Sequence, residues 1–263
     1  MKPTGQQFDL VSIQSQTFVE GIQFQHTMES TNDWALQNCS IDSHSYPLLV
    51  LCEKQVAGRG RGQNRWLASG GSLTCSLVLP SDFIKLEQNR QGLISLAAGV
   101  AVVQAIERVA GLNCQLKWPN DLMLEDRKLG GILVETKSTR LVVIGIGINI
   151  NHSFADEMPG SVSLCEALGD RLALQDVLIS TLDELEKQLQ SLNSSWQSIV
   201  QAIQSCDWLR GRRIKIGLGT KKFAGIAGGI NEAGGLLVRT DDGKEHTLFS
   251  GSIELLEDSP APD

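Results

Sequence analysis

The spacing of apolar residues changes along this chain, and the change restricts the folds it can adopt. Up to about residue 205, segments with the alternation or clustering of strands are interleaved with segments of helical spacing. The expected strands are 22–25, 47–53, 73–79, 112–118, 129–136 and 140–148, the last two joined by a short connection at 137–139. The expected helices are 31–37, 91–110 and 173–205. This interleaving predicts an α+β fold.

From Gly211 onward the chain contains only short strand-type segments broken by glycine, at 213–218, 222–230, 236–239 and 246–250. Such closely spaced short strands predict a small barrel appended to a larger domain. We therefore divide the chain into a domain at 1–208 and a C-terminal domain at 209–263. The tail from Asp258 is expected to be disordered.

The composition, with 41% hydrophobic and 20% charged residues, is that of a soluble globular protein. Polar and charged residues interrupt the apolar window 92–112, which predicts a buried helix and not a membrane span. The N-terminus lacks the apolar run of a signal peptide, and the six cysteines show no metal-ligand spacing. A net charge of -7 argues against general affinity for nucleic acid. We expect a cytoplasmic protein with reduced cysteines and neither a membrane nor a nucleic-acid partner.

The segment 58–66, Gly-Arg-Gly-Arg-Gly-Gln-Asn-Arg-Trp, concentrates three arginines in an acidic chain. Glycines allow successive backbone N–H groups to turn toward a ligand, and the planar arginine fork matches phosphate or carboxylate. These residues favour an anion site. A solvated basic loop is the alternative on the segment alone.

Residues 117–121, Lys-Trp-Pro-Asn-Asp, end an expected strand at a proline and place Asn120 and Asp121 at a sheet edge. A carboxylate beside an amide and a lysine suits a hydrated magnesium ion and the phosphates it bridges, although the Asn-Asp pair is also ordinary turn chemistry. Lys128 precedes Gly130-Gly131, and glycines in a strand mark close approach of a ligand or backbone. A solvated Lys128 is the alternative.

The segment 145–149, Gly-Ile-Gly-Ile-Asn, lacks the third glycine and the following helix of a dinucleotide-binding turn. It instead delivers Asn149 and Asn151 in alternation, which suits a ribose or purine edge. Ser30, Thr31 and Asn32 stand at an expected helix start, where capping accounts for at least one of them.

Five motifs, taken in this order along the chain, resemble those of biotin protein ligases: 29–32, 55–66, 117–121, 128–131 and 145–149. The resemblance implies a biotin/lipoate ligase catalytic domain akin to class II aminoacyl-tRNA synthetases, a mixed sheet with flanking helices, and a small C-terminal SH3-like β-barrel. Residues 62–65 depart from the pattern of many bacterial members. The short segment before the first motif leads us to expect a monofunctional form without an N-terminal DNA-binding domain.

The resemblance also implies roles for individual residues. It implies that the biotin ring is bound by Ser30, Thr31, Asn32 and Gln55, and the adenosine part by Trp66 and Asn149. It implies that the biotin carboxylate and the phosphates are bound by Gly58, Arg59, Gly60, Arg61, Lys117, Asn120, Lys128, Gly130 and Gly131. Catalytic roles are implied for Lys128, Arg59, Arg61 and Lys117, and metal binding for Asp121.

The implied activity is a ligase that makes biotinyl-5′-AMP from biotin and ATP with Mg²⁺ and transfers biotin to a lysine of a biotin carboxyl carrier domain. Such a domain belongs to acetyl-CoA carboxylase or another biotin-dependent carboxylase. A lipoate or octanoate ligase of the same superfamily and a non-catalytic biotin sensor or regulator are the alternatives. The sequence leaves open whether the chain forms a homodimer.

Overall fold

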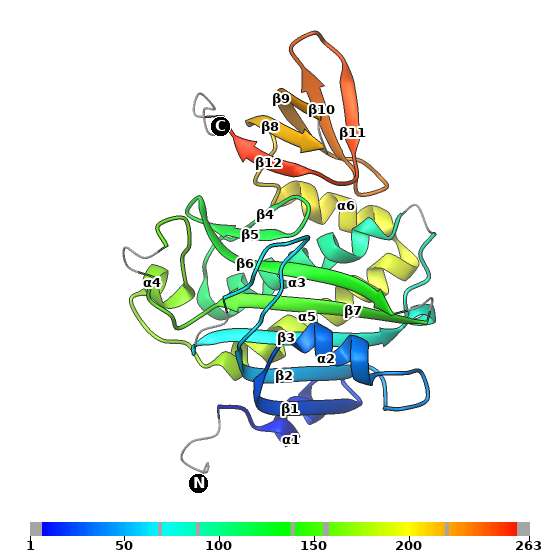
Figure 1. The fold of residues 1–263 in the computed structure, drawn as a ribbon, viewed down its shortest axis with the longest axis vertical. Helices are drawn as coiled ribbons and strands as arrows, with labels where there is room; N and C mark the ends of the chain where they lie inside the picture. The colour runs from blue at the N-terminus through cyan, green and yellow to red at the C-terminus, as the bar shows by residue number, and fades with distance from the viewer. Residues whose placement is uncertain are drawn as a thin grey trace.

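The computed structural model describes residues 7–67, 70–87, 90–137, 140–154, 158–218 and 221–256. The chain forms two separate sheets with helices around the larger one (Figure 1), which confirms the expected α+β class. The predicted disordered tail from Asp258 and positions 138–139 of the expected hairpin connection lie outside these described residues.

The larger sheet has seven strands in the order β1-β2-β3-β7-β6-β5-β4. Its first two strands are parallel and its other neighbours antiparallel, so the sheet is mixed. The strands are β1 (Gly21–Met28), β2 (Leu48–Gln55), β3 (Ser72–Pro80), β4 (Gln115–Lys117), β5 (Asp121–Leu124), β6 (Arg127–Lys137) and β7 (Leu141–Asn149). The sequence did not predict β5, because four residues directly after a turn are too few to show a period.

One face of this sheet is covered by α3 (Gly92–Ala110), α5 (Leu174–Ser194) and α6 (Trp196–Ser205), with α1 (Leu10–Gln16) beside β1. The main core lies between these helices and the sheet. Helix α3 is long and apolar enough to cross a membrane, but most of its residues are buried in this core. The prediction of a buried helix there is confirmed.

The single helix expected over 173–205 is wrong, because the structure has two helices, α5 and α6, that meet at Ser195. The Asn193 side chain accepts from Lys85 N (2.7 Å) and donates to Phe83 O (2.9 Å). This anchors the end of α5 to the last residue of the short 3₁₀ helix η1 (Ser81–Phe83) and to the segment after it. The backbone of Ser195 is not helical, and the chain changes direction there.

The opposite face of the larger sheet carries α2 (Thr31–Asn38), which packs on β2, β3 and β7 and forms a second, smaller core. Helix α4 (Leu164–Leu168) follows β7 and starts with a capping box between Ser163 and Glu166. Beyond α2, this face of the sheet is free of helices among the described residues, and it is here that the cavity described below opens.

The C-terminal strands form an antiparallel sheet in the order β11-β10-β9-β8-β12, not the closed barrel predicted from the sequence. The strands are β8 (Arg213–Leu218), β9 (Lys221–Ile230), β10 (Leu236–Thr240), β11 (Glu245–Leu248) and β12 (Ser252–Leu255). The two outer strands have four residues each and pair only inward, to β10 and β8, over the described residues. Strands this short leave the sheet open on both sides.

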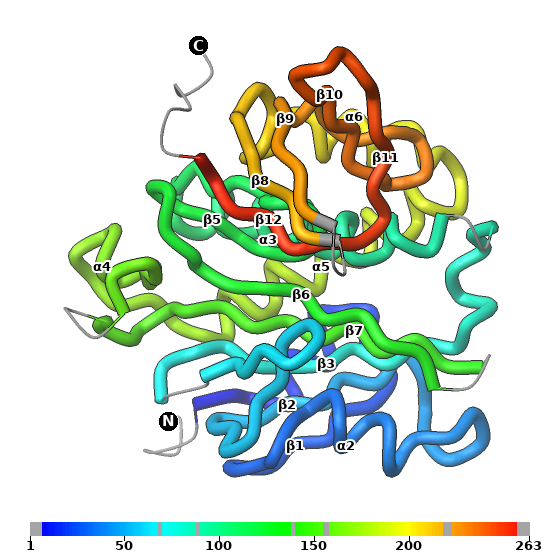
Figure 2. The backbone as a smooth tube through the Cα atoms, turned by 45° about the horizontal axis from the view of Figure 1, so that its top comes forward, coloured from blue at the N-terminus to red at the C-terminus, as the bar shows by residue number. Residues whose placement is uncertain are grey.

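The smaller sheet stands against the β4–β5 edge of the larger one (Figures 1 and 2). Leu116 of β4 exchanges backbone hydrogen bonds with the connecting segment, from Leu116 N to Cys206 O (2.7 Å) and from Trp208 N to Leu116 O (3.0 Å). Trp118 Nε1 donates to Gly234 O (2.9 Å) across the junction. The connecting segment therefore covers the exposed edge of the larger sheet and fixes the second sheet beside it.

Candidate functional site

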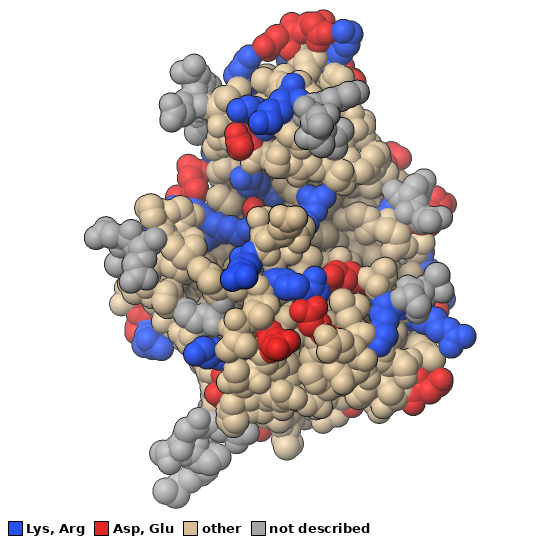
Figure 3. All heavy atoms as spheres, in the orientation of Figure 1, with Lys and Arg blue, Asp and Glu red and all other residues tan. Residues whose placement is uncertain are grey.

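A cavity of about 550 Å³ opens on the α2 face of the larger sheet, below the second sheet. Figure 3 shows Lys and Arg side chains bordering the hollow across the middle of this face. Most residues predicted from the sequence line it: Ser30, Thr31, Asn32, Gln55, Arg59, Gly60, Arg61, Trp66, Lys117, Asn120, Asp121, Lys128 and Gly131. The fold thus brings five distant motifs to one place.

Three predicted residues do not line the cavity. Gly58 and Gly130 are packed so tightly that an added Cβ would collide with the backbone of Trp66 or of β7. Asn149 is buried, and its Nδ2 donates to Val162 O (3.2 Å). In this structure the three residues make packing contacts and not the cavity surface.

One end of the cavity is built from polar side chains that are hydrogen-bonded to one another, and we call it the network end: Gln55, Thr31, Ser76, Asn32, Glu135 and Arg59. Gln55 Oε1 accepts from Thr31 N (2.6 Å) and from Thr31 Oγ1 (3.1 Å). Ser76 Oγ lies 2.7 Å from Thr31 Oγ1 and 2.6 Å from Asn32 Oδ1. The first four side chains are buried, so their orientations are fixed by each other.

The residues before this network provide the helix cap that the sequence predicts. Ser30 is the N-cap of α2, and its side chain accepts from Asp33 N (3.3 Å). The cap leaves Thr31 and Asn32 in the first turn, where their side chains face β3 and β6.

The arginine-rich segment is a narrow loop closed by its own backbone. Trp66 N donates to Gly58 O (3.0 Å), and Gly60 N donates to Asn64 O (2.8 Å). Since these bonds pair the two arms, side chains from the loop project to either side.

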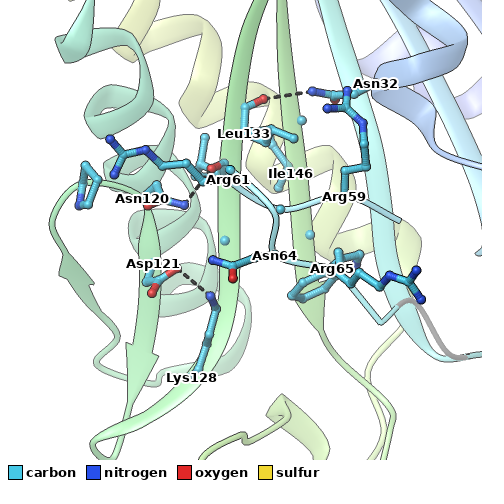
Figure 4. Close-up of a pocket in the computed structure, with 18 of the residues that line it drawn as sticks. Asn32, Arg59, Arg61, Asn64, Arg65, Asn120, Asp121, Lys128, Leu133 and Ile146 are labelled. Carbon is cyan, nitrogen blue, oxygen red and sulfur yellow. Dashed lines mark hydrogen bonds and ion pairs between the residues drawn. The ribbon is translucent and has the colours of Figure 1, made fainter. Parts of the chain in front are cut away.

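Two arginines of this loop point to different partners. Arg59 donates from Nη1 to Glu135 Oε1 (3.1 Å) and from Nη2 to Glu135 Oε2 (2.6 Å), and Nη2 also lies 2.7 Å from Asp33 Oδ1. Arg61 Nη1 instead donates to Gly251 O (3.4 Å) of the second sheet. Figure 4 shows Arg59 beside Asn32 and Arg61 at the opposite side of the loop.

The glycines of β7 make room for two side chains over the sheet. A Cβ on Gly145 would collide with the side chain of Asn32, and a Cβ on Gly147 would collide with the ring of Trp66. Trp66 Nε1 is buried and has no hydrogen-bond partner among the described residues. In the Gly-Ile-Gly pattern, the isoleucine therefore packs into the main core, while the two glycines leave space on the cavity face.

The other end of the cavity carries the charges that surround Asp121, and we call it the cation end: Arg61, Lys117, Asp121 and Lys128. Lys128 Nζ lies 2.6 Å from Asp121 Oδ1, and Figure 4 shows this pair opposite Asn32 and Arg59. The pair also lies over Gly131, since a Cβ there would contact both side chains.

A β-bulge puts Lys128 on the cavity face. The pairing of β5 with β6 shifts register, so that Leu122 opposes Gly130 while Met123 opposes Lys128. Strict alternation would place Lys128 and Gly131 on opposite faces of β6. The extra residue, Leu129, absorbs the shift and turns its side chain into the main core.

Lys117 is a partly buried cation of this end. Burial lowers its pKa from 10.5, against the attraction of Asp121, and Lys128 lowers it further. Its Nζ lies 5.1 Å from the ring centre of Trp208, the residue that leads into the second sheet. Trp208 Nε1 in turn donates to Asp126 (2.7 Å). The connecting segment therefore contributes to the setting of Lys117.

Several lining residues were not predicted from the sequence. Gly251, Ser252 and Ile253 come from the second sheet, and no local pattern marks them as facing a distant cavity. Thr74 of β3 lines it with a buried hydroxyl that has no partner among the described residues. Glu135 does not line the cavity itself, but its place beside the network end could have been found, because it continues the alternation of Gly131 and Leu133 along the cavity face of β6.

Solved structures share this architecture. The chain aligns with the biotin protein ligase from Aquifex aeolicus in complex with biotin and ATP at a TM-score of 0.79 and 26% identity, covering 90% of this chain and 99% of that one. The fold, a mixed sheet followed by a small antiparallel sheet, is that of biotin protein ligases.

Sequence comparison agrees with the fold. Residues 24–151 match the biotin/lipoate A/B protein ligase family, and residues 210–256 match the biotin protein ligase C-terminal domain. The chain is 36% identical over 224 residues to the bifunctional ligase/repressor BirA of Bacillus subtilis, covering 79% of this chain and 66% of that protein. It is 35% identical over 245 residues to BirA of Escherichia coli, covering 87% and 72%. The chain belongs to the biotin/lipoate A/B protein ligase family.

Proposed function

We propose that this chain is a biotin protein ligase, which activates biotin with ATP to biotinyl-5′-AMP and then transfers biotin to a lysine of a carboxyl carrier domain. The cavity carries this proposal, because it joins a network of polar side chains to a cluster of cations. The ligand shape that fits has a ring with hydrogen-bonding groups at one end and an anion at the other. Biotin has both.

The cation end suits the first step. A carboxylate oxygen attacks the α-phosphorus of ATP, the bond to the β-phosphate breaks, and pyrophosphate leaves. Both reactants are anions, so positive groups must offset their repulsion and the charge that develops at phosphorus. Arg61, Lys117 and Lys128 surround this position, and we assign them to the carboxylate and the phosphates.

Asp121 fits a magnesium site. It is the only carboxylate among the described residues that line the cavity, and hydrated Mg²⁺ in nucleotide sites is held by one or two carboxylates together with phosphates. When bound, the ion would neutralise phosphate charge. We assign Thr31 and Gln55 of the network end, together with Ser30 at the cap of α2, to the ring of the substrate.

The acceptor lysine must be neutral to attack the adenylate, and its ordinary pKa of about 10.4 makes that form rare at pH 7. Asp121, already paired with Lys128, is not a free base for it.

We propose a biotin carboxyl carrier domain as partner, no nucleic-acid or membrane partner, and a cytoplasmic location. All six cysteines are free thiols, in keeping with a reducing compartment. We place the domain boundary at residues 208–209.

Pyrophosphate release on mixing the protein with ATP and either biotin or lipoate tests the proposal. The expected result is pyrophosphate release with ATP and biotin and none with ATP and lipoate. Release with ATP and lipoate but not with ATP and biotin would make the chain a lipoate ligase, a kind of enzyme that the family also contains. Tight biotin binding without release would indicate a sensor.

A further inference from the structure

Arg59 differs from Arg61 of the same loop because two carboxylates already contact its guanidinium. Glu135 holds both Nη atoms, at 3.1 and 2.6 Å, and Asp33 lies 2.7 Å from Nη2. The hydrogen bonding of Arg59 to the Glu135 carboxylate is the main reason that the pKa of Arg59 is raised above its usual value. The third nitrogen, Nε, is buried and has no partner among the described residues. Three of the five N–H donors of the fork are therefore used within the protein, and two carboxylates oppose its single positive charge.

Glu135 connects this arginine to the start of α2. Its Oε2 accepts from Arg59 and also from Asn32 Nδ2, at 2.6 and 2.9 Å. Asn32 Nδ2 donates in addition to Leu133 O (3.2 Å), while Ser76 Oγ lies 2.6 Å from Asn32 Oδ1. Both donors and the acceptor of the Asn32 amide are therefore used within the protein.

The network ends at Gln55, whose Oε1 is used twice by Thr31. The Nε2 of Gln55 makes no hydrogen bond within the described residues, so it is the donor that remains for a ligand. Thr31 Oγ1 is held between Gln55 and Ser76. The position of these groups therefore depends on a chain of contacts that starts at Glu135.

Charge also separates Arg59 from the anionic part of the cavity. Asp33 and Glu135 together outweigh the single positive charge of Arg59, so a substrate carboxylate or phosphate brought to this point would meet two carboxylates. The cation end, with Arg61, Lys117 and Lys128, provides the favourable potential instead.

We propose that Glu135 is a positioning residue that fixes Arg59 and Asn32 as one unit, and that this unit sets the ring-binding groups of the network end and not the phosphate site. The identity of the ring as that of biotin rests on the proposed function. The inference changes the role implied for Arg59, which becomes a structural tie between the arginine loop and β6. It also gives a role to Glu135, which none of the motifs contains.

The test compares Glu135→Ala, Glu135→Gln and Arg59→Ala in biotin- and ATP-dependent pyrophosphate release. Loss of hydrogen bonds to a charged group should raise the KM for biotin about tenfold or more in Glu135→Ala, with the KM for ATP within about twofold of wild type. Glu135→Gln keeps a planar acceptor for Asn32 and should recover most of the loss. Arg59→Ala should also change the KM for biotin and not that for ATP. A raised KM for ATP in Arg59→Ala would overturn the inference, because it would return Arg59 to the phosphates.

Asp241→Ala is the matched control, since Asp241 forms a similar two-bond pair with Arg213 in the second sheet, at 3.0 and 2.5 Å. It should leave both KM values unchanged. Trypsin cleavage of the arginine loop in the ligand-free protein gives a readout independent of substrate. Glu135→Ala should be cleaved there several-fold faster than wild type or Asp241→Ala, and equal rates would contradict the tie. If wild type releases no pyrophosphate, the proposed function fails while the cleavage result still decides the inference.

Discussion

The two ends of the cavity differ in how far their polar groups are already paired. At the network end, buried side chains such as Thr31, Asn32 and Ser76 are hydrogen-bonded to one another before any ligand arrives. At the cation end, Lys128 is 43% exposed and has one partner, Asp121, while Lys117 is held over an aromatic ring. Figure 4 shows the two groups on opposite sides of the arginine loop.

This difference fits a division of labour. Prearranged donors and acceptors suit recognition of a neutral ring, because misplaced groups then cost hydrogen bonds. Charges with few partners suit a reaction in which negative charge grows, because their attraction is not already spent within the protein. The cation end also depends on both sheets, whereas the network end belongs to the larger sheet alone.

The largest effect is expected for Lys128→Ala, which removes a cation beside the reacting phosphate. Adenylate formation should fall by about 10²- to 10³-fold, and biotin affinity by much less, because the charge matters most in the transition state. Single-turnover rates and calorimetric binding measure the two effects. Lys187→Ala, which removes an ion-paired lysine on the outer surface of α5, is the control. Equal losses in rate and affinity would mean that Lys128 only binds.

Lys117→Met should slow adenylate formation by about 10²-fold and yet raise the thermal stability of the free protein at pH 7. Burial lowers the pKa of Lys117, so protonation costs more in the folded than in the unfolded state. This cost is fully present below the folded pKa and is lost as the pH rises toward 10.5. The Tm difference between variant and wild type should therefore shrink across that window. A Tm difference that grows with pH would show that the pKa of Lys117 is not lowered in the folded state.

Ser76→Ala should act on the network end alone. Removing this fully buried hydroxyl takes one hydrogen bond from Thr31 or Asn32, and the KM for biotin should rise about fivefold to tenfold at an unchanged KM for ATP. Ser72→Ala is the matched control, because that hydroxyl lies on the same strand and has no partner among the described residues. A similar effect in both variants would remove the distinction between the ends.

The smallest effect is expected for Trp118→Phe, which removes the bond from Nε1 to Gly234 O across the two sheets. The loss of about 1 kcal/mol should lower the Tm by about 2–4 °C. Since only the cation end depends on the second sheet, the KM for ATP should rise about twofold while that for biotin stays constant. Steady-state kinetics with each substrate varied measure both KM values, and Trp196→Phe on α6 is the control. A raised KM for biotin in Trp118→Phe would show that the network end also depends on the second sheet.

Much of the fold was predictable because its signals are local. The apolar stretch of α3, the alternation in β7 and the cap at Ser30 each depend on residues within a few positions of one another. The errors occurred where a distant contact overrides the local pattern. The side chain of Asn193 holds the end of α5 against η1 and the segment after it. The short outer strands β11 and β12 leave the second sheet open.

The candidate site shows the same limit. Five motifs named most of the residues that line the cavity, but not the bulge at Leu129 that turns Lys128 toward it. A register shift depends on the partner strand, and the sequence of β6 alone does not contain it. The contribution of Gly251 and its neighbours depends on how the second sheet docks, which is decided by contacts such as that of Trp118.

By itself, the sequence determined which chemical groups are present and in what order they reach the ends of strands and helices, since backbone preference and side-chain period act over short distances. Only the tertiary structure decided which partner each charge has. Arg59 and Arg61 are two residues apart in one motif, yet one is paired with carboxylates of α2 and β6 and the other reaches the second sheet. Ion pairs and hydrogen bonds require atoms within a few ångströms, and that proximity is set by the packing of segments far apart in the chain.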